Sequence, residues 1–213
     1  MRGAIHALTC MLTRYSEARL PTLHGEFRVV VYRTGEVGGA GASAVGQGPE
    51  EHVAMVMGDV TGPSILVRVH SSCFTGEVMG SLRCDCQAQL DAALGRIARE
   101  GRGVVVYMVQ EGRGIGLGNK VRAYQLQDEG KDTVEANLAL GFEADLRTYD
   151  LAAGILADLG VQSIRLMTNN PAKQDGLIRA GVRVDALEAH WVGASEHNAD
   201  YLEAKRLKLG HLP

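Results

Sequence analysis

The sequence predicts a mixed α/β or α+β fold: one compact domain whose first third is rich in strands and whose remainder alternates helices and strands. Runs of β-branched residues predict the early strands. After the cysteines, leucines and isoleucines recur at helical spacing, and glycines close the helical segments. The chain has 213 residues, 46% of them hydrophobic, which is enough apolar material for one core.

Each element follows from its local pattern. We expect an N-terminal extension over residues 1–18, a domain over 19–213 and a mobile glycine-rich loop over 35–48. Strands are expected at 27–32, 52–57, 65–70, 104–108, 163–167 and 182–187. Helices are expected on the face formed by Leu82, Leu90, Leu94 and Ile97, and at 119–129, 133–140, 149–159, 171–181 and 196–209.

Composition excludes several classes of protein. The net charge is −3, from 22 Lys and Arg against 25 Asp and Glu, whereas a nucleic-acid binder normally has a basic excess. No run approaches the ~20 apolar residues of a membrane helix. The N-terminus does not follow a secretory pattern, and four cysteines are few for a disulfide scaffold. We therefore expect a cytoplasmic protein with reduced thiols, no nucleic-acid partner and no membrane partner.

Three of the four cysteines form a candidate metal site. Cys73, Cys84 and Cys86 fall within fourteen residues, and three thiolates suit a soft-acceptor metal, by default Zn²⁺. Three protein ligands leave one position open, which is the catalytic arrangement in which the metal activates a water. The alternatives are unpaired buried cysteines and a structural zinc completed by a distant histidine. Cys10 stands alone and is not assigned a role.

A glycine-rich loop at residues 111–118 follows an expected strand and precedes an expected helix. Backbone N–H groups of such a loop can approach an anion, although a plain tight turn explains the glycines equally well. Arg113 lies in the loop, and Arg68 and His70 end a strand just before the first cysteine. Arginine forks match phosphate oxygens, so these residues indicate a phosphate-bearing ligand. Further polar candidates, each more often a surface residue when taken singly, are Gln89, Tyr124, Thr133, Asp145, Arg147, Thr168 and Lys173.

Together these segments resemble one known family. The motifs are Arg68-Val69-His70-Ser71-Ser72-Cys73-Phe74-Thr75-Gly76, Ser81-Leu82-Arg83-Cys84-Asp85-Cys86 and Gln110-Glu111-Gly112-Arg113-Gly114-Ile115-Gly116-Leu117, followed by the runs at 127–128, 132–137, 140–142 and 166–171. In order and composition they resemble GTP cyclohydrolase II, from about residue 19 to the end. Riboflavin pathways often fuse that enzyme to a butanone-phosphate synthase domain. This sequence has no room for one, so we expect the stand-alone form.

The resemblance implies a reaction and its participants. The family hydrolyses GTP with Zn²⁺ and Mg²⁺, releases formate and pyrophosphate, and leaves 2,5-diamino-6-(5-phosphoribosylamino)pyrimidin-4(3H)-one, the first step of riboflavin biosynthesis. It implies a homodimer whose substrates are GTP and water. The implied zinc ligands are Cys73, Cys84 and Cys86. The implied substrate-binding residues are Arg68, Val69, His70, Ser71, Ser72, Gln89, Glu111, Gly112, Arg113, Thr133, Thr168 and Lys173.

The resemblance also implies catalytic roles. Asp145 becomes the proton acceptor, Arg147 the group that meets the α-phosphate, and Tyr124 a further polar catalytic residue. The family pattern gives Arg147 covalent attack on the α-phosphate. Charge stabilisation is physically easier, because a guanidinium stays protonated in proteins.

Two positions depart from the family pattern. Ser72 stands where a carboxylate is common, and Val109 where an arginine is common. One hypothesis is a paralogue for a specialised pathway that retains the formyl group. The remaining alternatives are a zinc hydrolase of another purine nucleotide, a non-enzymatic zinc module and a degenerate nucleotide-binding paralogue.

Overall fold

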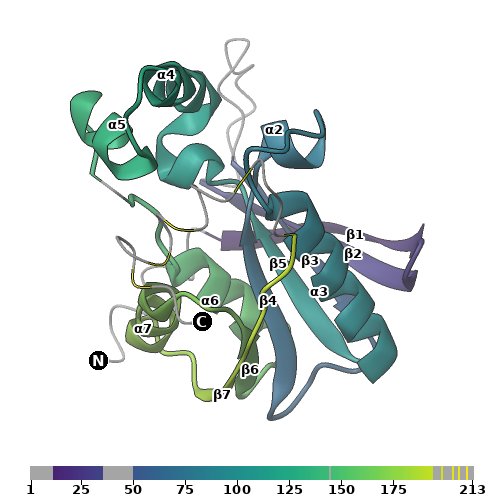
Figure 1. The fold of residues 1–213 in the computed structure, drawn as a ribbon. Helices are drawn as coiled ribbons and strands as arrows, with labels where there is room; N and C mark the ends of the chain where they lie inside the picture. The colour runs from purple at the N-terminus through teal and green to yellow at the C-terminus, as the bar shows by residue number, and fades with distance from the viewer. Residues whose placement is uncertain are drawn as a thin grey trace, which may run out of the picture.

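The computed structural model describes residues 12–35, 50–143 and 145–193, together with Asn198, Glu203, Arg206 and Gly210. Within these residues one seven-stranded sheet has the order β1-β2-β3-β5-β4-β6-β7 (Figure 1). Its strands are β1 (Leu12–Thr22), β2 (Gly25–Thr34), β3 (Glu51–Met57), β4 (Ile65–Ser71), β5 (Gly103–Met108), β6 (Ile164–Met167) and β7 (Val184–Glu188).

Helices cover the sheet and extend beyond its end. They are α2 (Phe74–Glu77), α3 (Cys86–Glu100), the 3₁₀ turn η1 (Glu111–Gly114), α4 (Gly116–Asp128), α5 (Thr133–Ala139), α6 (Asp150–Asp158) and α7 (Pro171–Arg179). α4 and α5 stand together beyond the sheet, and α2 lies at the same end of the molecule (Figure 1). None of the described helices has the length and apolar content needed to cross a membrane.

The sheet combines an antiparallel half with a parallel half. β1, β2, β3 and β5 pair antiparallel in succession. β4 is parallel to β5 on one side and to β6 on the other, and β7 is parallel to β6. The carboxyl ends of β4, β5, β6 and β7 therefore meet at one edge of the sheet, which is the end that faces α2, α4 and α5.

Two apolar cores lie on opposite faces of the sheet. On one face Ile97 of α3 packs with Phe27, Leu66, Val105 and Met167, all buried. On the other face the apolar residues of α6 and α7 pack against the alternate residues of the same strands, as the period of two along a strand requires. The residues of this second core include Val67, Val69, Val104, Val106, Ile155, Leu156 and Leu177.

The connections place a topological switch between β4 and β6. The chain leaves β4 through α3 on one face and reaches β5, whereas it leaves β6 through α7 on the other face. Adjacent parallel strands whose connections depart to opposite faces leave a crevice at their carboxyl ends, where open α/β sheets bind ligands. The residues that follow β4 and β6 line this crevice.

The predicted mixed α/β class and single compact domain are confirmed, as are the six predicted strands and the helices close to residues 119–129, 133–140, 149–159 and 171–181. The helical position predicted for Leu82 is wrong, because α3 begins at Cys86 and Leu82 lies in an exposed turn. Strand β1 was not predicted, and it crosses the boundary expected after residue 18. Most of the predicted segments 35–48 and 196–209, and Cys10, lie outside the described residues.

Candidate active site and metal centre

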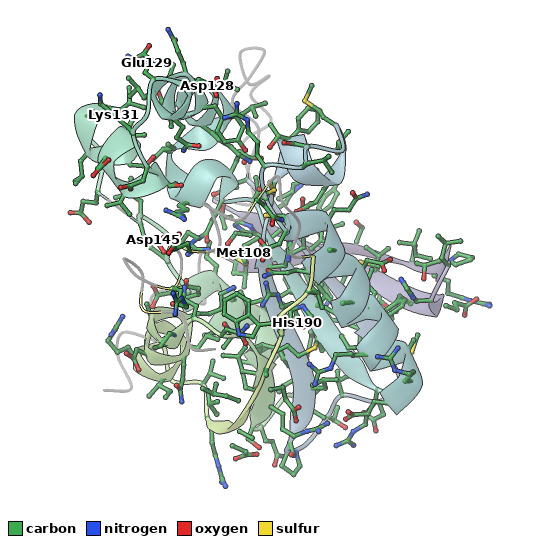
Figure 2. The ribbon with its side chains drawn as sticks, in the orientation of Figure 1. Met108, Asp128, Glu129, Lys131, Asp145 and His190 are labelled. Carbon is green, nitrogen blue, oxygen red and sulfur yellow. The ribbon has the colours of Figure 1, made fainter. Side chains whose placement is uncertain are left out.

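The crevice at the switch point collects polar side chains from four strand ends. β4 contributes Arg68, His70 and Ser71, the segment after β6 contributes Thr168, and α7 contributes Lys173. The rest of the lining comes from Cys86, Gln89, Arg113, Arg147, Asn169, Asn170, His190 and Trp191. Figure 2 labels Met108, at the end of β5, together with Asp145 and His190. Another cavity, of about 480 Å³, lies between β1, α6 and α7, and none of the predicted site residues line it.

The three predicted metal ligands converge beside this crevice, which Cys86 lines. The sulfur atoms of Cys73, Cys84 and Cys86 lie within 4.8 Å of one another. Cys73 follows β4 directly, and Cys86 is the first residue of α3. Gly76 completes the cradle, because a Cβ there would lie 2.8 Å from the sulfur of Cys84 and 3.2 Å from that of Cys73. Three convergent thiols in a space kept open by a glycine fit a zinc ion.

A partly buried ion pair lies against the thiol cluster. Lys120 Nζ lies 3.0 Å from the sulfur of Cys73 and 2.6 Å from Oε1 of Glu111. Glu111 also accepts hydrogen bonds from the backbone N–H groups of Phe74, at 2.6 Å, and Gly112, at 2.9 Å. Glu111 therefore ties the loop after β5 to the loop that carries Cys73, and both of its oxygens are occupied.

The three thiols of the cluster have different pKa values. Hydrogen bonds from the thiols of Cys84 and Cys86, together with Lys120, hold the pKa of Cys73 well below its ordinary value. The pKa values of Cys84 and Cys86 are raised, chiefly by the hydrogen bond of each with Cys73 and also by burial. Cys73 is thus the first thiolate of the three, and thiolates are the form that binds metal. Tyr124 stands nearby, with its hydroxyl 3.2 Å from Oγ1 of Thr75.

Arg68 is a buried cation at the floor of the crevice. Its Nη1 donates to the carbonyl oxygen of Met167 at 2.8 Å, and its Nη2 donates to Gln89 Oε1. Gln89 in turn donates to Asp85 Oδ2 at 2.7 Å. Burial lowers the pKa of Arg68 to about 10, against the opposing charge of Asp85. Its Nε is buried and has no protein partner, so a ligand in the crevice can supply one.

His70 is held by a carboxylate. Its Nε2 lies 2.8 Å from Glu77 Oε1, and Tyr107 donates its hydroxyl to Glu77 Oε2 at 2.5 Å. The rings of His70 and Tyr107 are stacked, with centroids 5.7 Å apart, because the two residues are register partners on β4 and β5. Burial lowers the pKa of His70, although Glu77 opposes the shift.

Asp145 and Arg147 form a two-pronged ion pair at the rim. Arg147 donates from Nε to Oδ1 at 2.8 Å and from Nη2 to Oδ2 at 2.5 Å, and its backbone N–H donates to Oδ1 at 3.0 Å. Burial raises the pKa of Asp145, but the hydrogen bonds and charge of Arg147 outweigh it, so the pKa lies below its ordinary value. In this arrangement Asp145 orients the guanidinium of Arg147. Its role as proton acceptor stays a prediction.

The glycine-rich loop is a turn of unusual backbone conformation. Gly112 and Arg113 both have left-handed backbones, with φ of 60° and 62°. Such a conformation is uncommon for a residue with a Cβ, and it clusters at functional sites. Arg113 lines the crevice and also a second hollow beside α4, and its Nη1 is buried with no protein partner. Thr133 and Tyr124 line the second hollow.

The remaining predicted residues fall into three groups. Lys173 is buried and donates to the carbonyl oxygen of Val69 at 2.6 Å, and Thr168 accepts from the N–H of Asn170 at 3.0 Å. The side chain of Val69 packs in the core, so only its backbone is available to the site. The hydroxyl oxygens of Ser71 and Ser72 are buried without protein partners.

Several site residues escaped sequence analysis. Lys120, Glu77 and Tyr107 contact predicted residues but belong to no recognisable catalytic spacing. His190 was also missed: its backbone N–H donates to Asn169 Oδ1 at 2.8 Å, and burial lowers its pKa to about 4. Lys120 had one available signal, since it lies in the helix that begins within the glycine-rich segment, at Gly116.

Comparison with known proteins now identifies the family. The model of GTP cyclohydrolase II matches residues 13–188. This chain belongs to the GTP cyclohydrolase II family. The riboflavin biosynthesis protein RibBA of Mycobacterium avium (strain 104) is 52% identical over 208 residues, covering 94% of this chain and 46% of that protein. RibBA of Mycobacterium tuberculosis (strain ATCC 25618 / H37Rv) is 53% identical over 206 residues, with 94% and 46% coverage.

The chain spans about half the length of these curated relatives. A solved structure, RibBX, a two-domain 3,4-dihydroxy-2-butanone 4-phosphate synthase from A. baumannii, superposes with a TM-score of 0.46 at 20% identity. That match covers 87% of this chain and 44% of the other. The family membership therefore rests on the sequence matches.

Proposed function

We propose that this chain hydrolyses GTP in a zinc-dependent reaction that opens the imidazole ring of guanine. The products are formate, pyrophosphate and 2,5-diamino-6-(5-phosphoribosylamino)pyrimidin-4(3H)-one. One observation carries the proposal: three thiols gather within 4.8 Å at a crevice that also holds buried arginine and lysine side chains. A family member with a soft-metal site next to an anion-binding crevice has both parts that this reaction needs.

Cys73, Cys84 and Cys86 would hold the zinc, in the space that Gly76 leaves. When bound, such an ion lowers the pKa of a water molecule and polarises the bond under attack. Lys120 and Glu111 support the cluster from the α4 side, because their ion pair joins the Cys73 loop to the glycine-rich loop. The donor set and the space both fit the ion.

Cationic side chains in the crevice would bind the triphosphate. Arg68, Arg113 and Lys173 line it, and Arg68 Nε and Arg113 Nη1 are buried donors with no protein partner. Phosphate oxygens satisfy such donors and compensate their charge. Gln89, Thr133, Thr168 and the segment 68–72 would contact the rest of the nucleotide, with Gly112 offering its backbone. Mg²⁺ would accompany the phosphates.

Arg147 would stabilise negative charge on the α-phosphate, and Asp145 would orient the guanidinium of Arg147. The two-pronged pair fixes the direction of the guanidinium of Arg147, and Arg147 lines the crevice. Because the guanidinium stays protonated, charge stabilisation is the physically simpler role. Tyr124 would act as a polar group between the thiol cluster and the second hollow.

We place the reaction at the start of riboflavin biosynthesis or of a specialised pathway, in the cytoplasm, in a homodimer with no nucleic-acid or membrane partner. The departures at Ser72 and Val109 favour one second candidate, a reaction that stops with the formyl group still attached. Either outcome uses the same crevice.

Mass spectrometry of the products tests the proposal. Zinc-loaded protein incubated with GTP and Mg²⁺ is expected to give formate, pyrophosphate and the diaminopyrimidine in equal amounts. Pyrophosphate with a formylated pyrimidine would support the second candidate. Turnover of another purine nucleotide but not of GTP, or no turnover by zinc-loaded protein, would contradict the proposal.

A further inference from the structure

His70 carries an unpartnered ring nitrogen at the crevice. Its Nε2 is occupied by Glu77 at 2.8 Å, while Nδ1 is buried and has no hydrogen-bond partner in the protein. The residue as a whole is only 2% exposed, and it lines the crevice together with Cys86 and Arg68. A buried polar atom without a protein partner, at a ligand-binding crevice, indicates a contact that the ligand completes.

The hydrogen bonds around His70 decide which nitrogen carries the proton. The carboxylate of Glu77 only accepts, so Nε2 is the N–H of the neutral ring and Nδ1 is left as an acceptor. Tyr107 donates to the second oxygen of Glu77 at 2.5 Å, which fixes the carboxylate, and its ring stacks on the imidazole. A carboxylate behind an imidazole that presents its free nitrogen to a cleft is the arrangement of a general base.

We propose that His70 is a catalytic base of ring opening, which takes the proton of the attacking water on Nδ1, and that Glu77 is its positioning residue. This proposal rests on the proposed function. As the water oxygen forms its bond to C8 of guanine, its proton passes to Nδ1, and the imidazolium returns that proton to the ring nitrogen whose bond to C8 breaks. One water is consumed for each C–N bond broken, and no oxidant or reductant takes part.

The site supplies reasons to prefer His70 over Asp145 for this step. Both oxygens of Asp145 are engaged by Arg147, and its pKa lies below the ordinary value, which makes it a weak base. Burial keeps His70 neutral near neutral pH, and neutral imidazole accepts protons. The titratable and charged groups that face His70 come from three neighbouring elements and from its own strand. They are Glu77 of α2, Tyr107 of β5, Lys173 of α7 and Arg68 of β4, with His190 after β7.

Substitution of His70 by asparagine tests the proposal. Asparagine keeps a polar atom near the position of Nδ1 but takes no proton, so we expect kcat for formate release to fall by about 100-fold or more, with KM changed less than about threefold. The low-pH limb of the kcat/KM profile should disappear. His24→Asn is the matched control, because His24 also pairs with a carboxylate, Asp91 at 2.7 Å, on the outer face of α3. Its kcat and pH profile should stay those of the wild type.

Glu77→Gln provides a second, independent test. The amide oxygen still accepts from Nε2, but the negative charge that raises the pKa of His70 is gone. The low-pH limb should therefore move to lower pH, and kcat should fall less than in His70→Asn. Zinc content and thermal unfolding are measured for every variant, so that a folding defect is recognised.

The outcomes separate the two proposals. A wild type that releases no formate from GTP overturns the proposed function and the role of His70 with it. An active wild type whose His70→Asn variant keeps kcat within about threefold overturns only the role of His70. A lower kcat with an unchanged low-pH limb does so too, because a merely structural role would leave the limb in place. If His70→Asn does not fold, an unmoved limb in Glu77→Gln overturns the proposal.

Discussion

Ser72 and Val109 are neighbours at the ends of two parallel strands: the backbone N–H of Ser72 donates to the carbonyl oxygen of Met108, the residue before Val109, at 2.8 Å. These are the two positions at which the resemblance leads us to expect a carboxylate and an arginine, and the sequence has neither. The departures are therefore one local change. Two neutral residues at these adjacent strand ends leave no unpaired charge, whereas a charge at only one of them would.

Introducing two opposite charges at these positions tests this relationship. Ser72→Glu alone places a carboxylate where the Ser72 hydroxyl is buried without a partner, and we expect it to cost about 1–2 kcal/mol of unfolding free energy. Val109→Arg alone should be nearly neutral, because Val109 is 43% exposed. The double variant should recover about 1 kcal/mol relative to the sum of the two. Additive values in urea unfolding would show that the two positions do not interact.

Gly76 should be needed for metal binding. A Cβ at this position would lie 2.8 Å from the sulfur of Cys84, so Gly76→Ala is expected to weaken zinc affinity at least about 10-fold by displacing the thiols. Gly118→Ala is the matched control, because a Cβ there meets nothing within 4 Å and the residue lies in α4. It should keep zinc affinity and gain up to about 1 kcal/mol of stability. Competition with a chelator measures the zinc affinity of both variants. Equal affinities would contradict the inference that Gly76 keeps space for the metal.

Glu111 should act chiefly as a structural tie. In Glu111→Gln one acceptor becomes a donor, so one of the bonds to Lys120, Gly112 or Phe74 is lost. We expect a loss of about 1–3 kcal/mol of unfolding free energy in the zinc-free protein. Glu143→Gln, on an exposed residue of the same chain, should change stability by less than about 0.5 kcal/mol. If Glu111→Gln destabilises the protein no more than Glu143→Gln does, the hydrogen bonds of Glu111 do not stabilise the contact between the two loops.

The ion pair of Asp145 and Arg147 predicts a pH dependence of stability. The pKa of Asp145 is lowered on folding, so its contribution is present above the unfolded-state pKa and is lost as pH falls through the folded-state pKa. Asp145→Asn should therefore lower the unfolding temperature at pH 7, at a cost of about 1–3 kcal/mol. The gap from the wild type should close toward pH 3. A gap that is constant between these pH values would contradict the pairing.

Local pattern predicted most of the fold, and the exceptions have physical reasons. Buried strands such as β4 and β5 are continuous runs of β-branched residues, because both of their faces are covered. β1 was missed because its side chains are largely exposed on both faces, so no apolar alternation marks it. Leu82 fits a helical period by chance, since the turn before Cys86 leaves it 60% exposed.

The site was predictable where spacing carries chemistry. The three cysteines and the glycine-rich loop are short-range patterns, and family resemblance supplied the polar residues between them. The contacts of Lys120 with Cys73 and of Glu77 with His70 depend on how α2 and α4 pack at the end of the sheet. Residues brought together by tertiary packing leave no periodic signal in the sequence. Glu77 could therefore be recognised as the partner of His70 only in the structure.

The most direct test of the central claim is formate release measured against zinc occupancy. Metal-free protein is loaded stepwise with zinc in the presence of GTP and Mg²⁺, and the bound metal is counted for each sample. The account predicts that turnover rises in proportion to bound zinc and stops rising at one ion per chain, since Cys73, Cys84 and Cys86 form one cluster. Formate release without zinc, or none from fully loaded protein, would contradict it.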